Sequence, residues 1–165
     1  MLNGKNSVSV EMKTYLIETF EYNSSTNKQL LEKIALLHDR EESIKLFSHL
    51  INCQYKWLAR IFKTPGYEKM DWWIPVYDFD KLEEEWNKSL QNWVDYLNTK
   101  TDDELATETS FIGYDGSFWA ATPKDIALQL NYHSIHHRAQ IQTLIRQQGV
   151  EPDFVDYIGT KYRRL

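Results

Sequence analysis

The apolar residues of segment 12–37 recur at alternating steps of three and four. This spacing predicts one long α-helix with a single apolar stripe, which must be buried against other elements. Asn23 and Asn27 occupy two stripe positions where leucine would be expected. We interpret them either as residues that fix the register of a helix bundle or as links to a nearby polar site. The stripe comprises Leu16, Phe20, Asn23, Asn27, Leu30, Ile34 and Leu37.

Three further segments show helical spacing of their apolar residues. The second predicted helix spans residues 41–62. The third begins at Asp80 with a capping-box pattern. The fourth starts with Thr122 as its N-cap and Pro123 in its first turn, and Gly149 ends it. Four long helices of this kind indicate a helix bundle.

Shorter elements complete the predicted fold. Between the third and fourth helices, two short aromatic-rich runs flank Asp115 and Gly116, a pair typical of a tight hairpin turn. The segment 153–165 indicates a short helix or turn. The predicted fold class is therefore all-α: an antiparallel four-helix bundle with a small β-hairpin before the last long helix and a short C-terminal helix. The length suits one domain over residues 1–165.

Charge and cysteine content restrict the partners and the location. The 19 basic and 24 acidic residues give a net charge of -5, which opposes general binding to nucleic acid. The single cysteine, Cys53, cannot form an internal disulfide, and the N-terminal segment lacks the pattern of a secretory signal. No apolar run approaches the roughly 18 residues needed to span a bilayer. We expect a cytoplasmic protein with a small-molecule substrate and no nucleic-acid or membrane partner.

Two histidines, His133 and His137, lie four residues apart in the apolar stripe of the fourth predicted helix. Side chains at this spacing point the same way, so both rings can reach one metal ion. A buried imidazole needs a polar partner to offset its loss of hydration, and two neutral rings serve each other poorly in this role. A bound metal cation would satisfy both rings. His49, at the edge of the stripe of the second helix, can complete a set of three. The alternative is a pair of core histidines satisfied by hydrogen bonds.

Four other residues near these positions have open interpretations. His136 lies off the stripe, on the surface or behind the site, and His38 is interpreted as a cap of the first helix. Cys53, one turn after His49, is either a core residue or a metal ligand. Arg138 is expected to point away from the site, toward an interface or a carboxylate on a neighbouring helix.

Aromatic residues make up 14% of the chain, enough for a helical core or for the lining of a pocket. The adjacent Trp72 and Trp73 fall in an irregular connection, where we favour loop anchorage over ligand contact. Trp57, Trp119 and Tyr132 are candidates for the mouth of a pocket, although aromatic residues at helical spacing more often belong to a core.

Three segments, "FEYNSSTNKQLLEKI", "SHLINCQYKWLARI" and "NYHSIHHRAQIQTLIRQQGVEPDFVDYI", resemble the DinB-like family of bacterial metal-binding four-helix bundles. The resemblance covers nearly the whole chain. It implies that His49, His133 and His137 hold a divalent metal, zinc or nickel, and that the protein forms a homodimer. Ala139 stands where the family usually has glycine after the arginine.

The resemblance also suggests an activity. Related members include bacillithiol S-transferases and mycothiol-dependent maleylpyruvate isomerases, which implies a metal-dependent enzyme with a low-molecular-weight thiol cosubstrate. The alternatives are a metal-dependent hydrolase, a non-catalytic metal-binding stress-response protein, and a bundle without metal. Neither the H-E-x-x-H pattern of metalloproteases nor the G-x-S-x-G pattern of serine hydrolases occurs in the chain.

Overall fold

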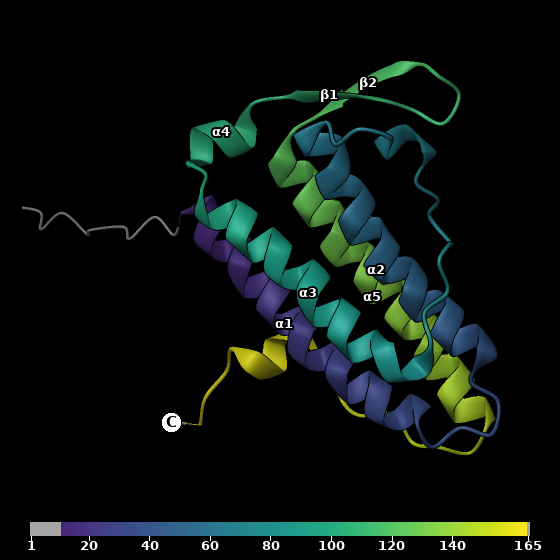
Figure 1. Cartoon of the computed structure of the whole chain (residues 1–165). Helices are drawn as coiled ribbons and strands as arrows, with labels where there is room; N and C mark the ends of the chain where they lie inside the picture. Colours follow the sequence, from purple (N-terminus) through teal and green to yellow (C-terminus); the bar gives the residue numbers. More distant parts are fainter. Residues whose placement is uncertain (1–10, 165) are drawn as a thin grey trace, which may run out of the picture.

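The computed structural model describes residues 11–164 (Figure 1). Helices α1 and α2 each pack against both α3 and α5, so α1 and α2 lie diagonally opposite in the bundle. In Figure 1, α1 and α5 run in one direction and α2 and α3 in the other. The predicted four-helix bundle is confirmed, with the order up, down, down, up. Its helices are α1 (Met12–Ile34), α2 (Glu41–Phe62), α3 (Phe79–Asn98) and α5 (Pro123–Gln147).

Most of the smaller elements lie at one end of the bundle, whereas the C-terminal segment packs along the side of α1 (Figure 1). The hairpin is confirmed: its strands pair antiparallel, and Gly116 at its turn has a φ of +80°, which suits glycine. The C-terminal element is one short 3-10 turn, and the five-residue helix α4 was not foreseen. These elements are η1 (Tyr67–Lys69), α4 (Asp102–Ala106), β1 (Thr109–Ile112), β2 (Phe118–Ala121) and η2 (Tyr157–Thr160).

The core lies where the apolar stripes meet, and all seven residues of the first predicted stripe are buried, including Leu37 just beyond the end of α1. Large rings fill its centre: Trp86 and Trp93 of α3 are fully buried, and Trp93 stacks on Phe20 with ring centroids 5.6 Å apart. Burying a ring of this size stabilises the fold by about 3 kcal/mol relative to leaving it in water. The spacing of apolar residues therefore predicted the inward faces of the helices correctly.

The end of α1 differs from the prediction. The helix ends at Ile34, and His38 is exposed beyond it, so the interpretation of His38 as a helix cap is wrong. The Arg40 guanidinium occupies that place and donates to the carbonyls of Ala35 at 2.7 Å and Leu37 at 3.3 Å. An arginine near the C-terminus of a helix satisfies carbonyls that have no partner within the helix.

The start of α3 also differs. The helix begins at Phe79, one residue before the expected start, and no side chain caps it, so the predicted capping box at Asp80 is wrong. The ring of Phe79 packs against the Arg40 guanidinium, 5.0 Å away, which holds the first turn in place. A capping box is present instead at α4, between Thr101 and Glu104.

Both ends of α5 follow the prediction. The Thr122 hydroxyl accepts from the backbone N–H of Asp125 at 3.2 Å. At the other end, Gly149 has a φ of +79°, and the N–H of Val150 donates to the carbonyl of Ile145 at 3.2 Å. This pattern is the glycine-dependent helix stop that the sequence indicated.

The connection of residues 63–78 returns along α2, which allows α3 to run in the same direction as α2 (Figure 1). It is tied to α2 by side chains: the Ser48 hydroxyl accepts from the N–H of Tyr77 at 3.1 Å, and Asn52 donates to the carbonyl of Pro75 at 3.0 Å. Within residues 11–164, no helix combines the length and the apolar character that crossing a membrane requires.

Candidate metal centre

The antiparallel contact between α2 and α5 brings His49, His133 and His137 together. The Nε2 atoms of His49 and His133 lie 2.8 Å apart. The ring centroid of His137 is 4.8 Å from that of His49 and 4.4 Å from that of His133. The three histidines selected from the sequence therefore form one cluster, although two of them lie more than eighty residues from the third.

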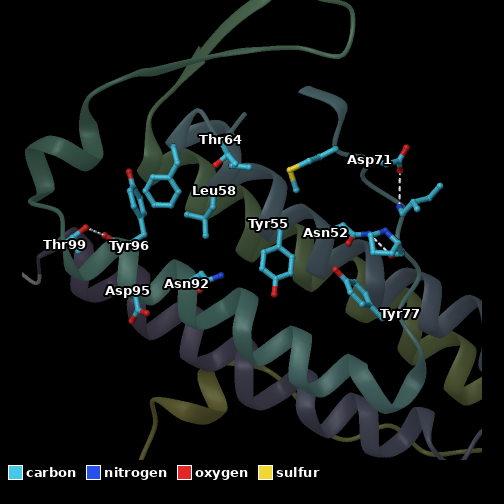
Figure 2. A pocket seen from close by; sticks show the side chains of 15 residues that line it. Asn52, Tyr55, Leu58, Thr64, Asp71, Tyr77, Asn92, Asp95, Tyr96 and Thr99 are labelled. Carbon is cyan, nitrogen blue, oxygen red and sulfur yellow. Dashed lines mark hydrogen bonds between the residues drawn. The ribbon is translucent and has the colours of Figure 1, made fainter. Parts of the chain in front are cut away.

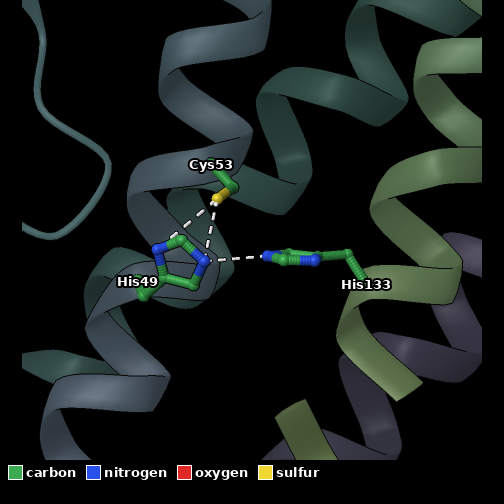
Figure 3. A group of neighbouring side chains, drawn as sticks. All are labelled: His49, Cys53 and His133. Carbon is green, nitrogen blue, oxygen red and sulfur yellow. Dashed lines mark hydrogen bonds between the residues drawn. The ribbon is translucent and has the colours of Figure 1, made fainter. Parts of the chain in front are cut away.

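Cys53 also faces this cluster (Figure 3). One donor atom from each of His49, Cys53 and His133 lies within 4.8 Å of the others, and His137 is not a member of this group. The Cys53 sulfur is 3.6 Å from Nε2 of His49. The structure thus places beside the histidines a cysteine for which the sequence left two interpretations open.

The types of donor atom, and part of their spacing, suit a tetrahedral transition metal. Zinc bonds of about 2.0 Å to nitrogen and 2.3 Å to sulfur separate a nitrogen and a sulfur ligand by about 3.5 Å and two nitrogens by about 3.3 Å. The observed separation of sulfur and nitrogen is 3.6 Å. The two nitrogens are hydrogen-bonded to each other at 2.8 Å, so the rings must separate by about 0.5 Å to hold an ion between them. Imidazole and thiolate are the ligands that zinc and nickel prefer, so the donor set fits such an ion.

Hydrogen bonds orient the imidazole rings. Nδ1 of His49 donates to the carbonyl of Trp72 at 2.8 Å, which leaves the lone pair of the neutral ring on Nε2. Nδ1 of His137 pairs in the same way with the amide oxygen of Gln140 at 2.6 Å. Such contacts fix the tautomer and the direction of a metal-binding histidine. Both rings therefore present Nε2 for ligation.

Burial keeps these histidines neutral. It is the largest cause that lowers the pKa of His49, His133 and His137. The neighbouring histidines add to this effect at His133 and bring its pKa to about 4. The hydrogen bond to Gln140 opposes the shift at His137 without reversing it. Near pH 7 the rings keep their lone pairs for a metal ion.

The Cys53 thiol behaves differently. Burial raises its pKa to about 12, although the positive charge of Lys56 acts in the opposite direction. Without a metal ion the side chain is therefore a protonated thiol at neutral pH. A thiol must lose its proton to bind a metal, so burial disfavours Cys53 as a ligand even though its distance from His49 fits.

The two adjacent tryptophans of the connection contact the site. The ring of Trp73 stacks on that of His49 at a centroid distance of 3.8 Å, and Trp72 supplies the carbonyl that His49 binds. The Trp72 ring also packs on Trp57 of α2. The interpretation as loop anchorage alone is therefore incomplete, because these residues also hold His49. No periodic pattern in the connection could have indicated this role.

A cavity of about 210 Å³ adjoins the cluster, and its lining includes Trp57, Trp72 and Gln129. Trp57 thus lines a pocket, as one of the alternatives proposed. Trp119 lies on the exposed hairpin, and Tyr132 lines a different cavity on the face formed by α1 and α5. These two residues do not belong to the candidate metal centre.

The two chain neighbours of His137 lie outside the group of three histidines. His136 is exposed, with its ring centroid 5.0 Å from that of His137. Arg138 is buried and points toward α1, as expected, but its partners are not carboxylates. Its guanidinium donates to the neutral side-chain oxygens of Tyr22, Asn23, Thr26 and Asn27.

The family model described as "DinB family" matches residues 11–164. The chain belongs to the DinB family. No curated protein matches it. The family match confirms the resemblance seen in the sequence and covers nearly the whole chain. Family membership, together with the donor group of His49, Cys53 and His133, supports a metal-binding DinB-like protein.

Proposed function

We propose that this DinB-family protein is a metal-dependent enzyme of the thiol S-transferase type. In this proposal His49, His133 and His137 hold a divalent ion, zinc or nickel. The observation that carries it is the convergence of three neutral imidazoles from α2 and α5 beside a small cavity. Three protein ligands with one open position are typical of catalytic rather than structural sites.

The residues around the cavity suit this chemistry. A divalent ion bound by the histidines would lower the pKa of a small thiol cosubstrate and favour its nucleophilic thiolate. Trp57 and Trp72 give the cavity apolar walls that exclude water, and the Gln129 amide offers a polar contact. Trp73, stacked on His49, limits access from the other side of that ring. The cavity of about 210 Å³ suits the reacting groups of small substrates rather than a macromolecule.

A second candidate function, a non-catalytic metal-binding protein, is favoured by the position of Cys53. If Cys53 binds the ion together with the three histidines, four protein donors leave no open position. The hydrolase alternative would use the same three histidines, with metal-bound water in place of the thiol as the nucleophile.

Metal content is the first test of the proposal. Protein purified without an affinity tag should contain about one transition-metal ion per chain. His49→Ala and His133→Ala should each lose the ion, because each removes a nitrogen donor. His136→Ala is the matched control and should keep it, since His136 is exposed beside the cluster. Metal-free protein of unchanged stability would contradict both candidate functions.

Activity separates the enzyme from the binding protein. The metal-loaded protein is mixed with cysteine, glutathione or bacillithiol and a chromogenic electrophile, and the rate of thioether formation is recorded. We expect a rate at least tenfold above that of the variant lacking all three histidines. Equal rates, together with normal metal content in the wild type, would favour the non-catalytic function.

We also propose that the protein is a cytoplasmic homodimer. Tyr132 and Ile135 are exposed on the outer side of α5, where apolar residues suit a helix-to-helix interface. Light scattering should therefore give twice the mass of one chain, and Ile135→Lys should give the monomer mass. Tyr114→Ser, which removes an exposed aromatic residue from the hairpin, should leave the dimer intact. A monomeric wild-type protein would refute the dimer.

A further inference from the structure

A second and larger cavity, of about 730 Å³, lies between α2, α3 and the connection that joins them (Figure 2). Its α2 residues, such as Tyr55 and Leu58, lie on the face that packs against α3, whereas His49 lies on the face toward α5. Cavities of roughly 300 to 1,000 Å³ are typical of small-molecule sites. The metal centre makes no use of this space.

Aromatic rings form much of the wall of this cavity. Phe62, Tyr55, Tyr77 and Tyr96 all line it, and Figure 2 shows Tyr96 toward one end, Tyr77 toward the other and Tyr55 between them. The Tyr55 hydroxyl donates to the carboxylate of Glu85 at 2.9 Å. The faces of such rings carry partial negative charge and attract cations as well as apolar groups.

The charged groups at the cavity are negative. Asp71 and Asp95 are the charged residues that line it, and Glu85 lies behind Tyr55. Among residues 11–164, none of these three carboxylates forms a salt bridge. Lys100, the basic residue close to Tyr96, is already paired with Glu104 at 3.9 Å. The ammonium of Lys56 donates to the carbonyl of Met70, which lines the cavity, and its charge partly offsets that of Asp71. Within residues 11–164, Asp95 is therefore the lining carboxylate that is least compensated by a cation.

One of these carboxylates is held in a fixed position. An oxygen of Asp71, Oδ1, accepts from the backbone N–H groups of Trp73 at 2.6 Å and Ile74 at 3.2 Å. Its other oxygen takes no part in these bonds. A group already oriented in this way loses little conformational entropy when a ligand binds.

We propose that this cavity binds a small organic cation, an amine or quaternary ammonium compound with an apolar body. The apolar body packs among the aromatic rings and Leu58, and the cationic head lies near Asp71 or Asp95. This proposal is independent of the proposed enzymatic function, because it uses none of the histidines. Its chemical basis is the combination of aromatic walls, lining carboxylates that form no salt bridge within residues 11–164, and sufficient volume.

Benzyltrimethylammonium is a suitable probe, because its nitrogen has no lone pair and cannot bind a metal at the histidines. Neopentylbenzene has the same shape without the charge. Both are titrated into ¹⁵N-labelled protein and followed by NMR. We expect the cation to shift amide signals of α2 and α3 around Tyr55 and Asp95, and to bind about tenfold more tightly than the neutral compound.

Two substitutions test the carboxylates. Asp95→Asn and Asp71→Asn each remove a charge and keep the side-chain shape, and asparagine at position 71 retains the oxygen that accepts from Trp73. Each should weaken binding of the cation by about three- to tenfold and leave binding of neopentylbenzene unchanged. Glu151→Gln, which removes a charge from the loop after α5, is the control and should have no effect.

Three results would overturn this inference. The first is equal affinity for the charged and the neutral probe, and the second is a set of shifted signals that lies outside α2, α3 and their connection. The third is the absence of binding at millimolar probe in protein whose spectrum shows it to be folded. Because the probe cannot bind a metal, none of these results bears on the metal centre.

Discussion

Two opposing effects act on the Cys53 thiol. Its distance of 3.6 Å from Nε2 of His49 suits a fourth metal ligand, whereas its pKa of about 12 opposes loss of the proton. A small thiol in solution has a pKa of about 8.5 and loses its proton more readily than the buried Cys53 thiol. We therefore expect an added thiol, rather than Cys53, to occupy the open position at the metal.

Cobalt(II) substitution tests this expectation, because thiolate ligation adds an intense near-ultraviolet absorption band. The cobalt protein should lack this band at rest and gain it when cysteine is added. Cys53→Ser should behave in the same way as the wild type. A band that is present at rest in the wild type and absent in Cys53→Ser would show that Cys53 binds the ion and would favour the non-catalytic function.

The lowered histidine pKa values predict how stability depends on pH. An unfolded histidine has a pKa of about 6.5, and that of His133 in the fold is about 4. Between these values the unfolded chain binds more protons, so the stabilisation present above pH 6.5 is lost as the pH falls toward 4. Urea unfolding of metal-free protein should show this loss. His133→Gln should reduce this loss, whereas His38→Gln, at an exposed histidine outside the cluster, should not. The same pH dependence of stability in both variants would contradict the assignment to His133.

At the scale of helices, the contact between α1 and α5 explains the two asparagines in the stripe of α1. Asn23 donates to Asn131, Asn27 donates to Ser134 at 3.0 Å, and both accept from Arg138. Polar side chains therefore fix the register of these two helices, as one of the sequence interpretations held. The other interpretation, a link to the polar site, is not supported, because the network lies on the side of α5 away from the histidine cluster.

Removing the Arg138 side chain should destabilise the α1–α5 contact. Arg138→Ala leaves four acceptors on α1 without this donor, three of them buried and one half-buried, and we expect the free energy of unfolding to fall by about 3 kcal/mol. Urea denaturation measures this change. Arg146→Ala, an exposed arginine of the same helix, should change it by less than about 0.5 kcal/mol. A loss below about 1 kcal/mol at position 138 would show that the network contributes little.

At the scale of the whole molecule, one short segment of the connection contacts both candidate sites. The Trp72 carbonyl and the Trp73 ring hold His49, while Asp71, Ile74 and Pro75 line the larger cavity. A ligand that shifts this segment changes both sites. By thermodynamic linkage, a metal ion at the histidines then alters the affinity of the larger cavity for the organic cation, and the organic cation alters the affinity for the metal by the same factor.

This arrangement predicts coupling between the metal and the organic cation. Zinc-loaded and metal-free protein should differ at least about threefold in affinity for benzyltrimethylammonium. Trp73→Ala should reduce the difference and preserve cation binding, because the Trp73 ring stacks on His49 and does not line the cavity, whereas the Trp72 carbonyl still binds His49. Identical affinities with and without zinc, measured by the same NMR titration, would show that the two sites are independent.

Several features of this protein follow from its sequence alone. Apolar spacing predicted the four long helices and their buried faces, and the Thr122 and Gly149 signals correctly placed the ends of α5. The same spacing selected His133 and His137 because helical periodicity is a local property of the chain. The predicted positions of the end of α1 and the start of α3 were less accurate. The structure places them at Ile34 and Phe79, where tertiary packing and the Arg40 guanidinium determine them.

Only the tertiary structure decided which groups surround the histidines. Cys53, the Trp72 carbonyl and the Trp73 ring reach His49 because an irregular connection folds back along α2, and the sequence carries no periodic signal for such a path. The uncharged partners of Arg138 and the cavity between α2 and α3 likewise depend on contacts between distant segments. Local patterns specify elements and their faces, whereas the packing of those elements determines which side chains meet.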